Sequence, residues 1–116
     1  MAPAGRDDAL MAQLRRGALQ YCVLALLSDE PRYAFDVVRD LGDVEGMVTS
    51  EGTIYPLLSR LRRDGLVATS WQESSAGPPR RYYELTAAGT AALDHFVTQW
   101  RTFSGAVDHL LAGRTA

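Results

Sequence analysis

The chain carries, from Ser50 to Val67, the segment SEGTIYPLLSRLRRDGLV, which has the pattern of a short helix with two unlike faces. Its apolar residues recur at i, i+3, i+4 and i+7, which places them on one stripe of a helix, and we expect this stripe to face a core. The stripe consists of Ile54, Leu57, Leu58 and Leu61. The opposite face has little bulk and ends in positive charge; it consists of Gly52, Pro56, Ser59 and Arg63, with Tyr55 and Arg60 at its flanks.

This second face has the side chains that a helix needs in the major groove of DNA. Small residues let the backbone approach the duplex, hydroxyl groups donate to phosphates, and guanidinium groups bind phosphates or guanine edges. Because Pro56 lacks a backbone N–H, we expect the regular helix to begin near Thr53, with residues 50–52 in a tighter turn. Glu51 is expected to stabilise the start of the helix through the helix dipole.

A basic hairpin is predicted directly after this helix. Gly65 is placed to end the helix in a left-handed conformation. Residues 67–73 and 81–85 have strand patterns, and SSAGPP between them has the composition of a turn. The turn leads into Arg80 and Arg81, so we expect two cations at the base of the hairpin, against the phosphate backbone or the neighbouring minor groove. A helix followed by such a hairpin is typical of the winged helix-turn-helix.

Two helices are predicted before this unit. Leu10 to Ser28 is apolar over more than half of a helix circumference, which exceeds the needs of one small domain and indicates a second partner surface. Residues 29–32 break this helix, and Tyr33 to Leu41, closed by Gly42, is predicted to be the first helix of the helix-turn-helix. In the long linker that follows, Met47 and Val48 could add a short strand against the wing.

A long helix is predicted at the carboxyl end, from an N-cap at Thr86 to about Ala112. Large apolar residues recur along it at intervals of three and four, as in a coiled-coil seam. They are Leu93, Phe96, Trp100, Phe103, Val107 and Leu110. A partner helix within the chain is one alternative. We expect instead a homodimer in which each tail helix packs across the other subunit's first helix, with two recognition helices ~34 Å apart on one face of DNA.

Composition indicates one domain with an appended element, because the chain has 116 residues of which 47% are hydrophobic. Cys22 is the only cysteine, which excludes an internal disulfide and a cysteine-rich zinc site, and we interpret it as a buried small hydrophobe. Met1 to Asp8 contains no apolar run of the kind found in signal peptides, so a cytoplasmic location without membrane contact is expected.

The net charge of −2 is unevenly distributed. From Arg60 to Arg81 there are five arginines against Asp64 and Glu73, so this stretch carries +3 and the rest of the chain −5. The positive charge therefore lies where the predicted recognition helix and wing are.

Enzymatic chemistry finds no support in the sequence. It shows no carboxylate pair, phosphate-cradling glycine loop or nucleophile with a base, so we expect neither an enzyme nor a cofactor. His95 and His109 are separated by about 21 Å along one helix and cannot share a metal within a subunit, so no metal is expected.

The three segments together resemble the PadR family of transcriptional regulators over nearly the whole chain. They are SEGTIYPLLSRLRRDGLV, LRRGALQYCVLALLSDEPRYAFDVVRDL at residues 14–41, and GPPRRYYELTAAG at residues 77–89. The resemblance implies a mainly α fold with a small β-hairpin wing, namely a winged helix-turn-helix domain plus a C-terminal dimerisation helix. It also implies repression of a nearby gene, relieved by a small molecule. We divide the chain into a flexible tail (1–9), a winged helix DNA-binding domain (10–85), a dimerisation helix (86–112) and a tail (113–116).

The resemblance also implies site residues. DNA contacts are expected from Ser50, Thr53, Tyr55, Arg60 and Arg63 of the helix and from Arg80 and Arg81 of the wing, to which the analysis of the helix faces adds Gly52, Pro56 and Ser59. In relatives with effector sites an aromatic residue matching Trp100 lines a cavity between subunits. A flat aromatic or hydrophobic effector is therefore expected at Trp100, Phe96, Leu14 and Ala18, although Trp100 could simply be packed core.

Two alternatives to a PadR-type regulator stay open at this point. A winged helix can serve as a protein-interaction module whose basic face binds an acidic partner. A MarR-type regulator is also a winged dimer, but such chains usually carry more helix ahead of the recognition unit.

Overall fold

The core is built on the apolar stripe of α4 (Glu51–Arg63), as predicted. The computed structural model describes the backbone of residues 4–114 and the side chains of residues 9–114. Ile54, Leu57, Leu58 and Leu61 are all buried, and they pack with buried residues of α2 (Leu19–Leu26), α3 (Ala34–Gly42) and the sheet. The other members of this core are Val23, Leu24, Leu27, Val37, Leu41, Val67 and Tyr83.

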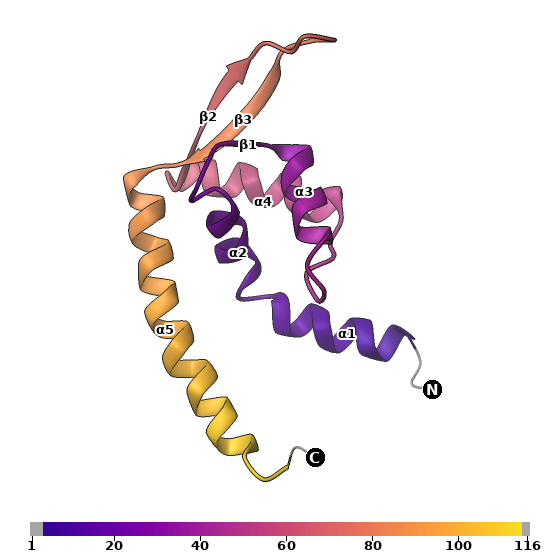
Figure 1. Ribbon diagram of the computed structural model, residues 1–116, viewed down its shortest axis with the longest axis vertical. Helices are drawn as coiled ribbons and strands as arrows, with labels where there is room; N and C mark the ends of the chain where they lie inside the picture. Colours follow the sequence, from indigo (N-terminus) through magenta and orange to yellow (C-terminus); the bar gives the residue numbers. More distant parts are fainter. Residues whose placement is uncertain (1–3, 115–116) are drawn as a thin grey trace.

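Three antiparallel strands lie beside these helices in the order β1-β3-β2. They are β1 (Arg32–Tyr33), β2 (Val67–Gln72) and β3 (Arg80–Leu85). The β2–β3 hairpin projects from the body, while α1 (Ala4–Arg15) and α5 (Ala87–Leu111) extend from it in other directions (Figure 1). This arrangement confirms the predicted fold class. No helix in residues 4–114 combines the length and apolarity that crossing a bilayer requires.

The predicted helix from Leu10 to Ser28 is instead two helices, α1 and α2, joined at residues 16–18. Gly17 lies in this linker, where its poor helix propensity favours a break, and the Ala18 N–H donates to the Arg15 carbonyl at 2.9 Å in a turn. α1 begins at Ala4, inside the stretch 1–9 that is predicted to be a flexible tail; residues 1–3 and 115–116 lie outside the described chain. Leu14 of α1 is largely exposed rather than buried.

The third strand comes from Arg32 and Tyr33 and not from Met47 and Val48. Arg32 and Tyr33 pair with Tyr83 and Tyr82 of β3, whereas residues 47–50 have no regular structure. A strand of two residues shows no alternating pattern, so the sequence could not reveal it. As a consequence α3 begins at Ala34, one residue later than predicted.

The start of α4 also differs from the prediction. The N–H groups of Thr53 and Ile54 both donate to the Ser50 carbonyl, at 3.1 and 3.0 Å, so the helix begins at Glu51 and not near Thr53. Pro56 lies inside the helix, in its second turn, where it cannot donate the hydrogen bond that would reach the Gly52 carbonyl, and the helix continues through it. The opposite end is as expected, with Gly65 at a φ of 79°.

The start of α5 is fixed against the body by Thr86. Its Oγ1 accepts a hydrogen bond from the Gly89 N–H at 3.0 Å, as an N-cap does, and donates to the Gly65 carbonyl at 2.7 Å. Gly89 is buried against the backbone of Leu66, and a Cβ at this position would overlap the Leu66 carbonyl oxygen. This close approach sets the direction in which α5 leaves the domain.

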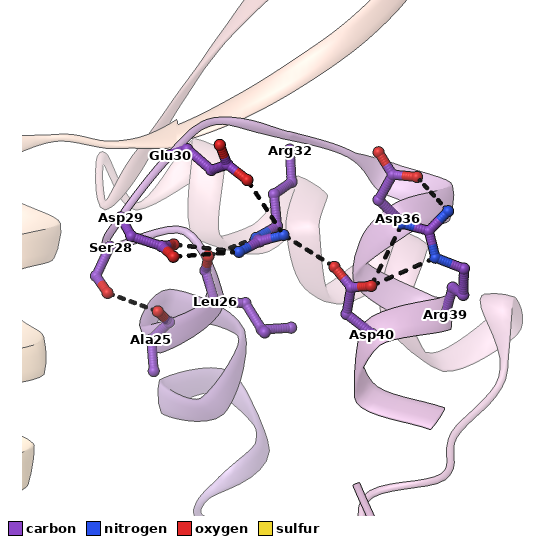
Figure 2. A network of polar contacts seen from close by, with 9 residues as sticks. All are labelled: Ala25, Leu26, Ser28, Asp29, Glu30, Arg32, Asp36, Arg39 and Asp40. Atoms are coloured by element: carbon purple, nitrogen blue, oxygen red, sulfur yellow. Dashed lines mark hydrogen bonds and ion pairs between the residues drawn. The ribbon is translucent and has the colours of Figure 1, made fainter. Parts of the chain in front are cut away.

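Arg32 ties together the two helices that support α4. Figure 2 shows its guanidinium group between the end of α2 and α3: Nε donates to the Leu26 carbonyl at 2.6 Å and Nη1 to Asp40 Oδ2 at 2.9 Å. Nη2 also reaches Asp29 Oδ1 at 3.2 Å. The side chain is only 18% exposed. From the sequence, Arg32 was interpreted only as part of a helix break.

Candidate nucleic-acid interface

The exposed face of α4 carries every DNA contact predicted for this helix. The residues Ser50, Gly52, Thr53, Tyr55, Pro56, Ser59, Arg60 and Arg63 are all exposed. Neither Arg60 nor Arg63 forms an ion pair with another described side chain of residues 9–114. Their guanidinium groups are thus available to an anionic partner. Thr53 and Tyr55 lie on opposite flanks of this face, as their spacing requires.

Tyr55 marks the flank of α4 that faces the sheet. Partial burial is the largest cause that raises the pKa of the Tyr55 hydroxyl. The neighbouring acidic groups of Glu51, Tyr33 and Tyr83 raise this pKa further. The hydroxyl therefore keeps its proton at neutral pH and can donate a hydrogen bond to a phosphate. Tyr55 as a whole is 41% exposed.

The two wing arginines lie at the loop end of the hairpin and not at its base, which corrects the predicted placement. Val67 pairs with Leu85 at the end next to α4, whereas Gln72 pairs with Arg80 and Trp71 with Arg81 at the other end. The prediction failed because the ladder continues almost to the loop, so that β3 already begins at Arg80.

The wing arginines are also held on opposite faces of β3, since neighbouring strand residues alternate. The Arg80 guanidinium lies over the Tyr33 ring at 4.8 Å, and that of Arg81 lies over the Trp71 ring at 4.9 Å. Arg81 Nε is buried without a hydrogen-bond partner among the described residues. Trp71 is 65% exposed. Neither aromatic partner is evident from the sequence, because no local pattern reveals the strand register and β1 that bring them beside the arginines.

The four residues of the predicted effector site line one open pocket of about 250 Å³ between α5 and the α1–α2 linker. Leu14, Ala18, Phe96 and Trp100 are joined there by Gly17, Gln99 and Phe103. The Phe96 ring stacks on the Tyr21 ring of α2 with 4.2 Å between the ring centroids, and its centroid lies 6.0 Å from that of Trp100. The structure thus brings the predicted residues together within a single chain, and Trp100 is partly exposed there.

The predicted dimerisation seam is only partly covered by this chain. Leu93 packs against the core, and Phe96 and Val107 are half-buried. Further along α5, Trp100 is 47% and Phe103 62% exposed, and Leu110 is exposed as well. Trp100, Phe103 and Leu110 therefore leave apolar surface exposed along the outer half of α5.

The remaining candidate groups show no reactive arrangement. Cys22 is half-buried, and burial raises the pKa of its thiol, as expected for a packed small hydrophobe. His95 and His109 are both exposed. Among the described side chains of residues 9–114, no three from histidine, cysteine or the acidic residues gather where a metal ion could bind.

Comparison with known proteins gives one consistent result. Residues 23–95 match the transcriptional regulator PadR-like family. The transcriptional regulator Rv3488 of Mycobacterium tuberculosis is 35% identical over 83 residues, which cover 72% of this chain and 76% of that protein.

Solved structures agree with the family match. The PadR-like transcriptional regulator from Bacillus cereus is 36% identical with a TM-score of 0.80, over 87% of this chain and 98% of that one. The PadR family transcriptional regulator from Eggerthella lenta is 33% identical with a TM-score of 0.81, over 96% and 99%. These relatives are named as transcriptional regulators and not as enzymes.

Proposed function

Because the chain belongs to the PadR-like family of transcriptional regulators, we propose that it is a repressor that binds a pseudo-palindromic operator as a homodimer. The family implies regulation through DNA binding. The observation that carries the proposal is the exposed face of α4, where small residues and hydroxyl groups share one surface with two arginines that form no ion pair with a described side chain. This combination suits insertion of the helix into a major groove.

Each part of this face has a role in the proposed complex. Gly52 and Pro56 let the helix backbone approach the base edges, while Ser50, Thr53 and Ser59 donate to phosphates. Arg60 and Arg63 reach phosphates or the O6 and N7 acceptors of guanine. The wing adds Arg80 and Arg81, each already oriented by an aromatic ring, which lowers the conformational entropy lost on binding.

The homodimer is supported by the apolar surface that α1 and α5 leave uncovered. Leu10 and Leu14 of α1 are exposed, and so are Phe103 and Leu110 on the outer half of α5. In the proposed dimer each α5 packs across the first helices of the partner, and the twofold axis presents two copies of α4 to successive major grooves.

We further propose that a flat aromatic or hydrophobic effector enters the pocket beside Trp100 and releases the protein from DNA. The pocket is lined mainly by apolar groups, and Gln99 supplies a polar group for orientation. Trp100 lines this pocket and is about half exposed, so its indole can offer a stacking surface. Quenching of tryptophan fluorescence by candidate compounds, compared between the native chain and Trp100→Phe, tests this part of the proposal.

DNA binding is tested by fluorescence anisotropy with duplexes from the chain's own upstream region, over about 50–200 mM salt. We expect affinity to fall steeply with salt. Arg63→Ala should weaken binding by about 1–3 kcal/mol. Arg101→Ala removes the same charge from an exposed position of α5 and serves as the matched control. Equal binding by the two variants would reject the assignment of Arg63, and binding of an acidic protein in place of DNA would reject the proposed function.

A further inference from the structure

A second, larger pocket lies on the flank of α4 that points away from Tyr55. Its volume is about 420 Å³, and its walls come from α1, the α1–α2 linker, the start of α2, Thr49 and α4. The polar side chains that line it are Arg15, Arg16, Gln20, Thr49, Thr53 and Arg60.

Three positive charges meet in this pocket without a described counter-charge. Arg15, Arg16 and Arg60 form no ion pair with any other described side chain of residues 9–114. Arg15 is fixed in place, because its Nη1 donates to the Gly46 carbonyl at 2.9 Å. The side chains of Arg15, Arg16 and Arg60, from two segments far apart in the sequence, thus line one space, and an anion there would offset the repulsion between their charges.

The position of the pocket relative to α4 indicates which anion it receives. A helix in the major groove has a phosphate backbone on each side, because the groove is only about 12 Å wide. Tyr55 lies on the flank of α4 beside the sheet, whereas Thr53 and Arg60 lie on the opposite flank and line the pocket. The wing can therefore approach one backbone while the pocket approaches the other.

We propose that this pocket binds a phosphate group, with Arg15 and Arg16 as ligands beside Arg60 and Thr53. The occupant is a backbone phosphate of the operator, on the side of α4 away from the wing. This inference rests on the proposed DNA binding for its natural source of phosphate, but the chemistry of the pocket does not depend on it. A soluble phosphorylated molecule would satisfy the same donors.

Arg16→Gln tests the proposal, since it removes one charge from an exposed side chain that makes no described hydrogen bond. One phosphate contact contributes about 0.9 to the slope of log K against log[salt]. If the native chain and the variant bind equally at 1 M salt, this difference in slope makes the affinity of the variant for DNA about 8-fold lower at 0.1 M salt. The loss should be equal for operator and unrelated duplexes. Arg16→Ala should behave alike. Arg101→Ala, with the same charge change on α5, should leave the slope near that of the native chain.

A second measurement separates the two sources of phosphate. Thermal unfolding of the DNA-free chain is followed with added inorganic phosphate, with sodium chloride at equal ionic strength as control. Stabilisation by phosphate that is lost in Arg16→Gln, with an unchanged DNA slope, would assign the pocket to a soluble ligand and overturn the backbone assignment.

The remaining outcomes are equally decisive. If Arg16→Gln changes neither the DNA slope nor the response to phosphate, the pocket is not a phosphate site. If the native chain fails to bind duplexes, the proposed function fails, while the thermal measurement still decides whether the pocket binds phosphate.

Discussion

Gly89→Ala should destabilise the protein, although alanine is the better helix former. The added Cβ would overlap the backbone carbonyl oxygen of Leu66 and press against Leu85 Cδ2 at 3.1 Å. Because a backbone atom cannot rotate away, the steric cost belongs at the upper end of the roughly 1–3 kcal/mol typical of overpacking. The gain in helix propensity is about 1 kcal/mol. The net loss is then about 2 kcal/mol, which lowers the Tm by about 8 °C for a chain of this size.

Gly105→Ala is the matched control, because it makes the same change in the same helix. Nothing lies within 4 Å of a Cβ at Gly105, so we expect a gain of about 1 kcal/mol and a Tm higher by about 4 °C. Both variants are compared by circular dichroism melts at one protein concentration, since the proposed dimer would make the Tm depend on concentration. If Gly89→Ala were as stable as Gly105→Ala, the close contact between α5 and Leu66 would not exist as described.

Three further predictions concern other parts of the molecule. Arg32→Met should cost about 1.5–3 kcal/mol in urea unfolding, because it leaves Asp40 Oδ2 and the Leu26 carbonyl without the N–H groups that Arg32 donates, and an unchanged midpoint would contradict the role of this side chain. Burial raises the pKa of the Cys22 thiol, so less thiolate is present at pH 8 than in the unfolded chain. A disulfide reagent should therefore react more slowly with the native chain than with the urea-unfolded chain. Equal reaction rates would count against burial of Cys22. Phe103→Glu should shift sedimentation equilibrium toward monomer while the helical circular dichroism spectrum is preserved. Thr98→Glu, on the other side of α5, should remain dimeric. If Phe103→Glu is still a dimer, α5 does not form the interface.

The strongly periodic elements were predictable from sequence, because their pattern reflects burial directly. The stripe of α4 and the N-cap at Thr86 appear where the spacing placed them. The break in the first helix did not follow from the pattern, since Gly17 lies inside an apolar run that continues on both sides of it. The poor helix propensity of Gly17 favours a break there, whereas the apolar pattern favours one continuous helix. The sequence does not show which of the two effects is stronger.

The candidate site, too, could be predicted from the sequence only where one element carries the residues. Residues on the face of α4 could be chosen from a helical wheel, because one element carries them all. The partners of Arg80 and Arg81 depend on strand register and on β1, which brings Tyr33 beside the hairpin. The pocket at Arg15 and Arg16 required knowledge of how the linker lies against α4, a contact between segments that no local pattern encodes.

The short linker after α1 forms the common wall of both pockets. Gly17 and Ala18 face the space beside Trp100, whereas Arg15 and Arg16 face the space beside α4. A compound that displaced one side of this wall would move the guanidinium groups on its other side. Thermodynamic reciprocity then requires operator DNA to alter the affinity for that compound by the same factor, so each ligand can be titrated to report the presence of the other.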